Sequence, residues 1–337
     1  MNGSVNHESQ IGTSPIHRLD GAVRAPYSIQ FELTYRCDLN CVMCYNGSGE
    51  TIGRELSDDQ WLDIVQHAIE LGIMEAIVSG GEPLMRGKEF VTCLLEELSD
   101  GGVSIHLITN GTFVDRDFVR SLRGLNLRII QTSIDGHTPE IHNVIRQGRN
   151  FNDVVAATSL FASHGFYCRV GTTIVKMNEE HIEDILELAV SLGAQEIVID
   201  QFLPIGRSIR NYDRIATSLS HEDIRKEVER LSKAYADLIT VRIGMLCQDQ
   251  LRQCSDQEVN DSIIIRPNGD LRLGCMAPFT CGNVMDTALR ALWETGGAYA
   301  WKSSKVVEYV SRVHDNESMR AEYQKLGILH GYENETI

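Results

Sequence analysis

The sequence lacks the features that mark several large protein classes. No stretch of its 337 residues approaches the roughly 18 uninterrupted apolar residues of a membrane span. The N-terminus, MNGSVNHESQ, has neither the basic region nor the apolar region of a secretory signal peptide. We therefore expect a cytoplasmic protein with no membrane partner.

Positive charge is also scarce. The chain has 31 lysines and arginines against 47 aspartates and glutamates, which gives a formal net charge of −16. Because phosphate binding needs a basic surface, this balance argues against a nucleic-acid partner. The apolar share of 42% is ordinary for a folded protein, and the length suits one large α/β domain with a small appendage, or two domains.

Cysteine is too sparse for a disulfide scaffold. The chain has nine cysteines, an odd number, far below the density of small secreted domains. Three of them lie within residues 37–44 and four within 247–281. In a reducing cytosol, such groups indicate metal binding or catalysis rather than disulfides. The isolated Cys93 and Cys168 are interpreted as small core residues.

Strand–helix units recur along the middle of the chain. Ser57 opens a predicted helix with a capping box, Gly72 closes it, and an apolar strand follows at 76–78. The same arrangement returns at 182–193 and 197–199. Further strands are predicted at 28–33, 103–108, 127–132 and 168–175, and further helices near 88–99, 115–123, 151–164 and 221–237.

Alternating strands and helices predict a parallel sheet with right-handed crossovers. Between about residues 27 and 240 they form six strand–helix units, two short of a full barrel. We therefore predict an α/β fold, a partial (β/α)6 TIM barrel.

The chain changes character after residue 240. A β-hairpin is predicted over 262–273, with its turn at Asn268-Gly269, and a helix near 286–294. This region has four cysteines and too little apolar sequence for a core of its own, so we expect a metal-stapled module. The expected domains are a flexible leader at 1–26, the barrel at 27–240, the module at 241–300 and a covering helical tail at 301–337.

Polar and glycine-rich residues follow directly after the predicted strands. They lie at Thr34–Cys37, Ser79–Pro83, Thr109–Gly111, Ser133–Gly136 and Asp200–Gln201. In parallel sheets and barrels, ligands bind at the carboxyl ends of the strands. We therefore predict the active site at this rim.

Three cysteines, Cys37, Cys41 and Cys44, lie within eight residues on one predicted loop. Structural zinc sites usually take four ligands in two separated pairs, and a thioredoxin-like pair would leave Cys37 unexplained. Iron–sulfur clusters are held by thiolates, and three ligands on a cubane leave its fourth iron open to a substrate or cofactor. The pattern favours an iron–sulfur cluster over zinc.

Two motifs together resemble the radical S-adenosylmethionine (SAM) superfamily. These are Cys37-x3-Cys41-x2-Cys44 after the first strand and Gly80-Gly81-Glu82-Pro83 after the second, and the resemblance spans about residues 27–295. It implies a [4Fe–4S] cluster on the three cysteines, with SAM bound at the fourth iron. It further implies reductive cleavage of SAM to methionine and a 5′-deoxyadenosyl radical that abstracts a substrate hydrogen. An electron donor such as flavodoxin or ferredoxin is expected.

The resemblance also assigns contacts with SAM. The residues so assigned are Met43, Gly80, Gly81, Glu82, Pro83, Ser133, Arg146, Gly171 and Ile174. The glycines leave backbone carbonyls accessible to the methionyl ammonium group. Met43 stands where the family often has an aromatic residue, and it can pack against adenine. Ser133 is expected at the ribose or carboxylate; Arg146 is expected at the carboxylate, with a surface ion pair as the alternative.

The later cysteines resemble the C-terminal modules called SPASM and Twitch, which hold one or two auxiliary [4Fe–4S] clusters. No cysteine follows Cys281, so one auxiliary cluster is expected. Its ligands would come from Cys247, Cys254, Cys275 and Cys281. Alternatively, Cys247 or Cys281 stays free and donates a hydrogen atom to a substrate radical. Buried thiols or a zinc knot are the remaining interpretation.

Enzymes of this group act mainly on two substrate classes. Some crosslink, oxidise or epimerise residues of a ribosomally made precursor peptide; others dehydrogenate, epimerise or decarboxylate sugars and aminocyclitols of antibiotic pathways. About 26 residues before the barrel are too few for a fused leader-binding domain, which can instead be a separate protein. We favour peptide maturation. A non-catalytic iron–sulfur or zinc protein is the third hypothesis, and it would not require the Gly80–Pro83 motif.

Overall fold

The computed structural model describes residues 18–19, 22–23, 25–50, 53–244, 247–328 and 335–337. Its strands are β1 (Arg18–Leu19), β2 (Ala22–Val23), β3 (Ser28–Glu32), β4 (Glu75–Ser79), β5 (Ser104–Thr109), β6 (Leu127–Ser133), β7 (Cys168–Ile174), β8 (Glu196–Gln201), β9 (Thr240–Ile243), β10 (Ser262–Ile265), β11 (Asp270–Gly274), β12 (Ala277–Asn283) and β13 (Glu335–Thr336). The first two pair with each other, and the others form one sheet in the order β13-β12-β11-β10-β3-β4-β5-β6-β7-β8-β9.

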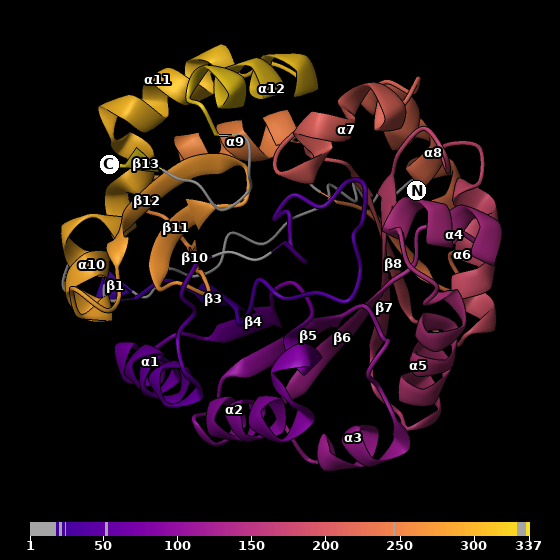
Figure 1. Ribbon diagram of the computed structural model, residues 1–337, viewed down its shortest axis with the longest axis horizontal. Helices are drawn as coiled ribbons and strands as arrows, with labels where there is room; N and C mark the ends of the chain where they lie inside the picture. Colours follow the sequence, from indigo (N-terminus) through magenta and orange to yellow (C-terminus); the bar gives the residue numbers. More distant parts are fainter. Residues whose placement is uncertain (1–17, 20–21, 24, 51–52, 245–246, 329–334) are drawn as a thin grey trace, which may run out of the picture.

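Helices connect and cover these strands. They are α1 (Asp58–Leu71), α2 (Lys88–Asp100), α3 (Arg116–Ser121), α4 (Pro139–Arg146), α5 (Phe151–Ser163), α6 (Ile182–Ser191), α7 (Arg207–Ile215), α8 (His221–Ala234), α9 (Cys247–Asp256), α10 (Leu289–Thr295), α11 (Ser304–Arg312) and α12 (Asn316–Lys325), with 3-10 turns η1 (Pro83–Arg86) and η2 (Gly297–Lys302). Figure 1 shows α1, α2, α3 and α5 on the outer side of a curved sheet, and α11 and α12 beside the C-terminal strands.

The six predicted strand–helix units are confirmed. Strands β3 to β8 pair in parallel in their sequence order, and a helix follows each of them. The first helix begins with the predicted capping box at Ser57 and ends at Gly72, whose φ of 98° is left-handed. The fold is therefore α/β with a mostly parallel central sheet.

The parallel part of the sheet is longer than the sequence pattern indicated. Strand β9 pairs in parallel with β8 at one side, and β10 pairs in parallel with β3 at the other. The predicted hairpin is present as β10 and β11, with Gly269 at φ 90° in its turn. It continues the main sheet instead of forming a sheet of its own, because residues Ser262–Ile265 align with Ser28–Phe31.

Two apolar cores lie on the sheet. The larger one joins the strands to the helices over them, and Trp61 of α1 meets Phe31 of β3 edge-on in it. The second joins β11 and β12 to α11 and α12 through residues such as Phe279, Tyr309 and Met319. We expected too little apolar sequence for a core in this region. Residues 241–300 accordingly do not form the second core alone, because the tail helices supply many of its side chains.

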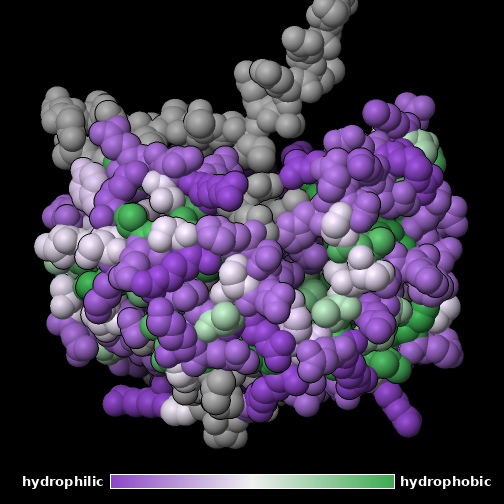
Figure 2. Space-filling view, turned by 90° about the horizontal axis from the view of Figure 1, so that it is seen from above, coloured by the Kyte–Doolittle hydropathy of each residue, from purple (hydrophilic) through white to green (hydrophobic). Residues whose placement is uncertain are grey.

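The exposure of Cys93 corrects one further detail. Cys168 is buried as predicted, but Cys93 is exposed, because the buried face of α2 is formed by Val91 and its leucines. In the tail, Val306 is fully buried, whereas Val307 is 46% exposed. Among the described helices, none is long and apolar enough to cross a membrane. The face drawn in Figure 2 is mainly hydrophilic, with apolar side chains scattered over it.

Candidate active site

One cavity brings the clustered cysteines together with the carboxyl ends of several strands. Its wall consists of Cys37, Leu39, Cys41, Met43, Cys44, Tyr45, Asn46, Ser48, Ser79, Gly80, Gly81, Ile108, Thr109, Asn110, Ser133, Arg146, Thr173 and Arg207. The ends of β4, β5 and β6 contribute, as the polar rim predicted, and so does the end of β7, which was not part of that rim. Two other parts of that predicted rim, at Asp135–Gly136 and Asp200–Gln201, do not line the cavity.

The cysteine loop is fastened from one side by the start of α7. Arg207 donates from Nη1 to the carbonyl of Cys41 at 3.0 Å, and its backbone N–H donates to the carbonyl of Cys44 at 2.9 Å. Gly206, with φ 59°, lies so close that a Cβ atom there would be 2.2 Å from the carbonyl oxygen of Tyr45. The loop and helix therefore hold each other at backbone distance.

The C-terminal end of α4 fastens the same loop from another side. The backbone N–H of Val42 donates to the carbonyl of Ile145 at 2.9 Å, and that of Asn40 donates to the carbonyl of Arg146 at 3.2 Å. Met43 packs in a small apolar cluster with Phe202 and others, and it reaches the cavity wall. The predicted cofactor-facing position of Met43 agrees with this placement.

The three cysteines suit a group larger than one ion. Among the described residues, one set of His, Cys, Asp and Glu ligands is gathered closely enough for a single metal ion, and it does not include these cysteines. Burial raises the pKa of Cys37, and it raises the pKa of Cys41 to about 11 although Arg146 opposes this. Three thiolates fall short of the four ligands of a structural zinc site but suit a cubane with one open iron, so the donor set fits an iron–sulfur cluster better than structural zinc.

The glycines after β4 are required by close packing against the loop after β3. A Cβ on Gly81 would lie 2.2 Å from the carbonyl oxygen of Arg36. The N–H of Gly81 donates to Thr34 at 2.6 Å, and Gly80 adopts φ 147°. Both glycines line the cavity, whereas Glu82 and Pro83, which we also expected at the cofactor, do not.

Glu82 instead positions the loops. Its buried carboxylate accepts hydrogen bonds from the hydroxyl of Thr109 at 2.8 Å and from the N–H groups of Asn110 at 2.7 Å and Leu84 at 3.1 Å. Burial raises the pKa of Glu82 to about 7, and these hydrogen bonds oppose the rise. The side chain therefore joins the ends of β4 and β5.

Ser133 and Arg146 both line the cavity, as predicted. The alternative of a surface ion pair for Arg146 is wrong. Its Nε donates to Asp135 at 2.7 Å, and the two side chains are 11% and 0% exposed. Burial alone lowers the pKa of Arg146, but the charge of Asp135 raises it overall. Asp135 also accepts from the N–H of Thr173 at 2.8 Å, so the pair links β6, β7 and α4.

Strand β7 presents a different residue from those expected. Ile174 is fully buried in the larger core. Gly171 leaves room for the side-chain amide of Gln131, because a Cβ atom on Gly171 would lie 2.6 Å from that amide nitrogen. Neither lines the cavity, but Thr173 does. The side chains of a strand alternate between its faces, so Ile174 and Thr173 point to opposite sides.

A buried polar network beside the cysteines was not predicted. Glu32 accepts from the hydroxyl of Tyr45 at 2.7 Å and from the amide of Asn46 at 3.0 Å. Arg266, directly after β10, donates to Asn46 at 2.6 Å. Tyr45 and Asn46 line the cavity, so this network connects the cysteine loop to the C-terminal strands. A glutamate within the apolar strand SIQFEL was the available sequence signal.

The later cysteines are partly brought together. Cys254 of α9 and Cys275, between β11 and β12, are close enough to interact electrostatically; burial raises the pKa of Cys254 to about 12. Cys275 also lies near Arg272 and Glu32. Cys281 of β12 is in contact with both apolar cores, and the side chain of Cys247 lies outside the described part of the chain.

Comparisons with known proteins agree with this geometry. Residues 31–189, which include the cysteine loop and most of the strand–helix units, match the sequence model of the radical SAM superfamily. The chain is 32% identical over 200 residues to the AdoMet-dependent heme synthase of Methanosarcina barkeri, covering 57% of each chain. It is 27% identical over 278 residues to the PqqA peptide cyclase of Streptomyces rochei, covering 80% of this chain and 75% of the relative.

The fold is shared with solved structures. Streptococcus suis SuiB bound to S-adenosylmethionine superposes with a TM-score of 0.71 at 14% identity, over 84% of this chain and 68% of SuiB. The matched region is little more than half the length of the heme synthase. The solved structures therefore show the fold, and the match to the superfamily model covers the part of the chain that carries the cysteine loop.

Proposed function

We propose that the protein is a radical SAM enzyme that matures a ribosomally synthesised peptide. The observation that carries this proposal is the cavity in which Cys37, Cys41 and Cys44 face two close-packed glycines and the polar ends of four strands. Such a cavity can hold an iron–sulfur cluster and a small polar cofactor next to each other.

These cysteines would hold a [4Fe–4S] cluster, and an external carrier such as flavodoxin or ferredoxin would reduce it. The cluster would supply the electron for cleavage of the S–C5′ bond of SAM into methionine and a 5′-deoxyadenosyl radical. This radical would take a hydrogen atom from the substrate. The chain's own residues bind and orient SAM. Gly80 and Gly81 offer backbone carbonyls to its ammonium group, and Arg146, oriented by Asp135, faces its carboxylate. Ser133 and Met43 border the remainder.

The C-terminal segment is proposed to hold one auxiliary [4Fe–4S] cluster. Cys254, Cys275 and Cys281 all pack against the second core, and Cys281 and Cys247 are the further candidate ligands or hydrogen donors. Such a centre would supply an acceptor for the electron that a substrate radical loses, together with a proton, when the peptide is oxidised or crosslinked. In an epimerisation, a thiol would instead return a hydrogen atom.

The relatives support a peptide substrate first. The PqqA peptide cyclase is similar over 80% of this chain, whereas the heme synthase match covers 57%. A small-molecule substrate, such as a sugar or aminocyclitol, is the second candidate. The heme synthase favours it to the extent that its name describes a small-molecule product.

SAM cleavage tests the activity. Protein reconstituted anaerobically with iron and sulfide and reduced with dithionite is expected to release 5′-deoxyadenosine, measured by liquid chromatography and mass spectrometry. The triple variant Cys37→Ala/Cys41→Ala/Cys44→Ala is expected to release none while its circular dichroism spectrum is unchanged. Cys93→Ala, an exposed cysteine on α2, is the matched control. Undiminished release by the triple variant would refute the proposal.

The substrate is tested separately. A precursor peptide encoded beside this protein should change mass in step with 5′-deoxyadenosine formation. An aminoglycoside or nucleotide sugar that is consumed while every peptide stays unchanged would instead establish the second candidate.

The auxiliary cluster has its own readout. The triple variant should retain about four irons and four sulfides per chain, as a thiolate-held cubane implies. Adding Cys254→Ala or Cys275→Ala to it should remove that iron, and adding Cys168→Ala, a cysteine buried in the larger core, should not. A triple variant without iron contradicts the auxiliary cluster while leaving the SAM chemistry untouched.

A further inference from the structure

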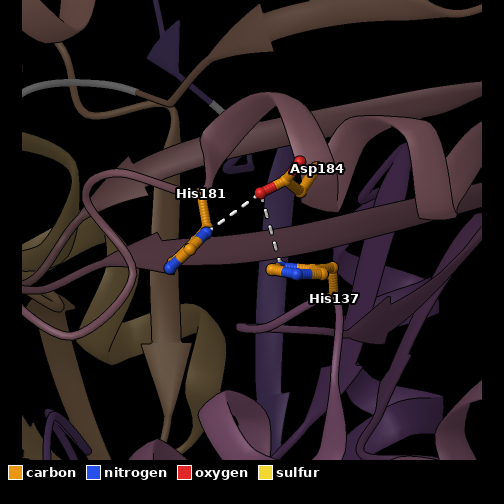
Figure 3. Close-up of side chains that lie close together, drawn as sticks. All are labelled: His137, His181 and Asp184. Carbon is orange, nitrogen blue, oxygen red and sulfur yellow. Dashed lines mark hydrogen bonds and ion pairs between the residues drawn. The ribbon is translucent and has the colours of Figure 1, made fainter.

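Three metal-ligating side chains meet outside the cavity described above. His137 lies in the connection between β6 and α4, His181 directly precedes α6, and Asp184 lies in the first turn of α6. Figure 3 shows both imidazole rings directed toward the same carboxylate. Two neighbouring strand–helix connections, about forty residues apart in the sequence, therefore place their side chains at one point.

The distances suit one small cation after minor rotation of the side chains. Oδ2 of Asp184 lies 2.9 Å from Nδ1 of His181 and 3.7 Å from Nδ1 of His137. Ligand atoms from all three residues lie within 4.8 Å of one another. Around an ion with metal–ligand bonds of about 2.0–2.2 Å, neighbouring ligand atoms are separated by roughly 3–3.5 Å. The observed spacings are close to that range.

The contacts within the protein leave one ligand atom without a hydrogen bond. Nδ1 of His137 is buried and has no hydrogen-bond partner in the part of the chain that the structure describes. The ring of His181 makes no capping hydrogen bond to α6. A single carboxylate oxygen therefore faces two imidazole nitrogens, and a cation between them would give all three groups a partner.

The neighbouring acidic groups are occupied elsewhere. Glu183 binds Arg230 and Tyr235, and Glu179 binds Thr217 and Ser218. The three candidate ligands are nevertheless accessible, since their side chains are 27%, 36% and 50% exposed. An ion from solvent can therefore reach His181 and Asp184 directly, and rotation of the His137 ring would bring its buried Nδ1 to the ion.

We propose that His137, His181 and Asp184 bind a divalent transition-metal ion, with Zn²⁺ as the best fit. Two imidazoles and one carboxylate suit Zn²⁺, whereas Mg²⁺ and Ca²⁺ prefer oxygen ligands throughout. Three protein ligands leave a coordination position for water or for an added ligand.

The bound ion would link two elements next to the active site. His137 is two residues from Asp135, which orients Arg146 at the cavity wall, and the other two ligands belong to α6. Binding therefore fixes the β6–α4 connection to α6 and stabilises the folded chain, because an ion that binds only the folded state favours it. This proposal does not depend on the substrate, or on SAM cleavage.

Zinc binding tests the site. It is measured on the reconstituted protein, in which the cysteines proposed as cluster ligands already hold iron and sulfide. Equilibrium dialysis against Zn²⁺, followed by metal analysis, should give one more zinc per chain in the unaltered protein than in His181→Ala. The affinity should fall by at least about 100-fold in His137→Ala, His181→Ala and Asp184→Asn. His67→Ala, an exposed histidine on α1, should bind like the unaltered protein.

Two further measurements keep the interpretation clear. Zn²⁺ should raise the melting temperature of the unaltered protein and of His67→Ala but not that of His181→Ala. The melting temperature of His181→Ala without zinc shows whether this variant folds. X-ray absorption at the zinc edge should show nitrogen and oxygen neighbours. Sulfur neighbours at about 2.3 Å would place the zinc on cysteines and overturn the proposal. Equal zinc binding by the three variants and the unaltered protein would overturn it as well.

Discussion

At the scale of single residues, the cavity depends on two glycines, and a different structural constraint excludes a side chain at each of them. Gly206 combines φ 59° with the close approach of Tyr45. Gly81 is constrained by space alone, since the backbone of Arg36 occupies the position a side chain would need. Substitutions at these positions therefore act on the cysteine loop before they act on global stability.

Gly81→Ala is expected to reduce SAM cleavage at least tenfold, because the new methyl group must displace the Arg36 carbonyl and with it the loop that carries Cys37. Initial rates of 5′-deoxyadenosine release measure this. Gly296→Ala is the matched control, since the nearest atom to its Cβ is at 3.8 Å, an ordinary contact. Equal rates for both variants would mean that the glycine is not needed for the cavity.

His142 is expected to make stability depend on pH. Its Nδ1 accepts from the N–H of Asp135 at 3.2 Å, so its ring is neutral with the proton on Nε2, facing Asn150 at 3.0 Å. Burial, helped by the charge of Arg146, lowers the pKa of His142 to about 4 from 6.5. Well above pH 6.5 the histidine is neutral in both the folded and the unfolded chain, so it lowers the free energy of unfolding by nothing. As the pH falls from 6.5 toward 4, the unfolded chain takes up the proton first and stability decreases.

Between pH 7 and 5 this histidine should therefore cost the protein about 2 kcal/mol of unfolding free energy. Urea unfolding of the unaltered protein and of His142→Gln at both pH values measures the difference. The variant should lose less stability over that interval, and the exposed His67→Gln should lose as much as the unaltered protein. A larger loss in His142→Gln would contradict the assignment of a neutral buried ring.

At the scale of elements, the cysteine loop is held between the start of α7 and the end of α4. Both contacts are to its backbone carbonyls or N–H groups, so the loop keeps its shape whatever its side chains bind. Arg207 makes the largest single contribution, with hydrogen bonds from its guanidinium to the carbonyls of Cys41, Gly47 and Ser48.

Arg207→Lys is expected to loosen this attachment, because an ammonium group cannot span carbonyls that a planar guanidinium reaches together. The expected loss is about 2 kcal/mol of unfolding free energy and a faster loss of iron from the reconstituted protein under chelator. Arg210→Lys on the same helix is the control, since Arg210 is exposed and pairs with Glu50. Equal iron release by both variants would show that α7 does not hold the loop.

At the scale of the whole molecule, one sheet joins both apolar cores. The parallel pairing of β10 with β3 continues the strand order from the strand–helix units into the C-terminal strands. The buried contact of Arg266 with Asn46 crosses the same boundary. We therefore expect the two cores to unfold together.

Met319→Ala, in the second core, should lower the melting temperature of the whole chain, with about 2–5 kcal/mol of stability lost to the cavity it leaves. Differential scanning calorimetry should still show one transition. Val307→Ala, at an exposed position of α11, should change little. A separate early transition in Met319→Ala would show that the C-terminal part unfolds independently.

Much of the architecture followed from local patterns. The strands, the first capped helix and the hairpin turn at Gly269 are encoded by neighbouring residues, because helix caps, apolar periodicity and turn conformation act over a few positions. The spacing of Cys37, Cys41 and Cys44 likewise favoured an iron–sulfur cluster before any contact was known. The short helices α4, α7 and α9, of 8, 9 and 10 residues, were not predicted.

Contacts between segments that are distant in the sequence were decided only by the tertiary structure. Strand register and the crossing of helices over the sheet decide three such contacts. They are the hydrogen bond of Glu82 with Asn110, the ion pair of Arg146 with Asp135, and the position of Thr173 instead of Ile174 at the cavity wall. The meeting of His137 with the first turn of α6 has the same origin. Sequence patterns determine which chemistry is available at each strand end, and long-range packing determines which groups reach one another.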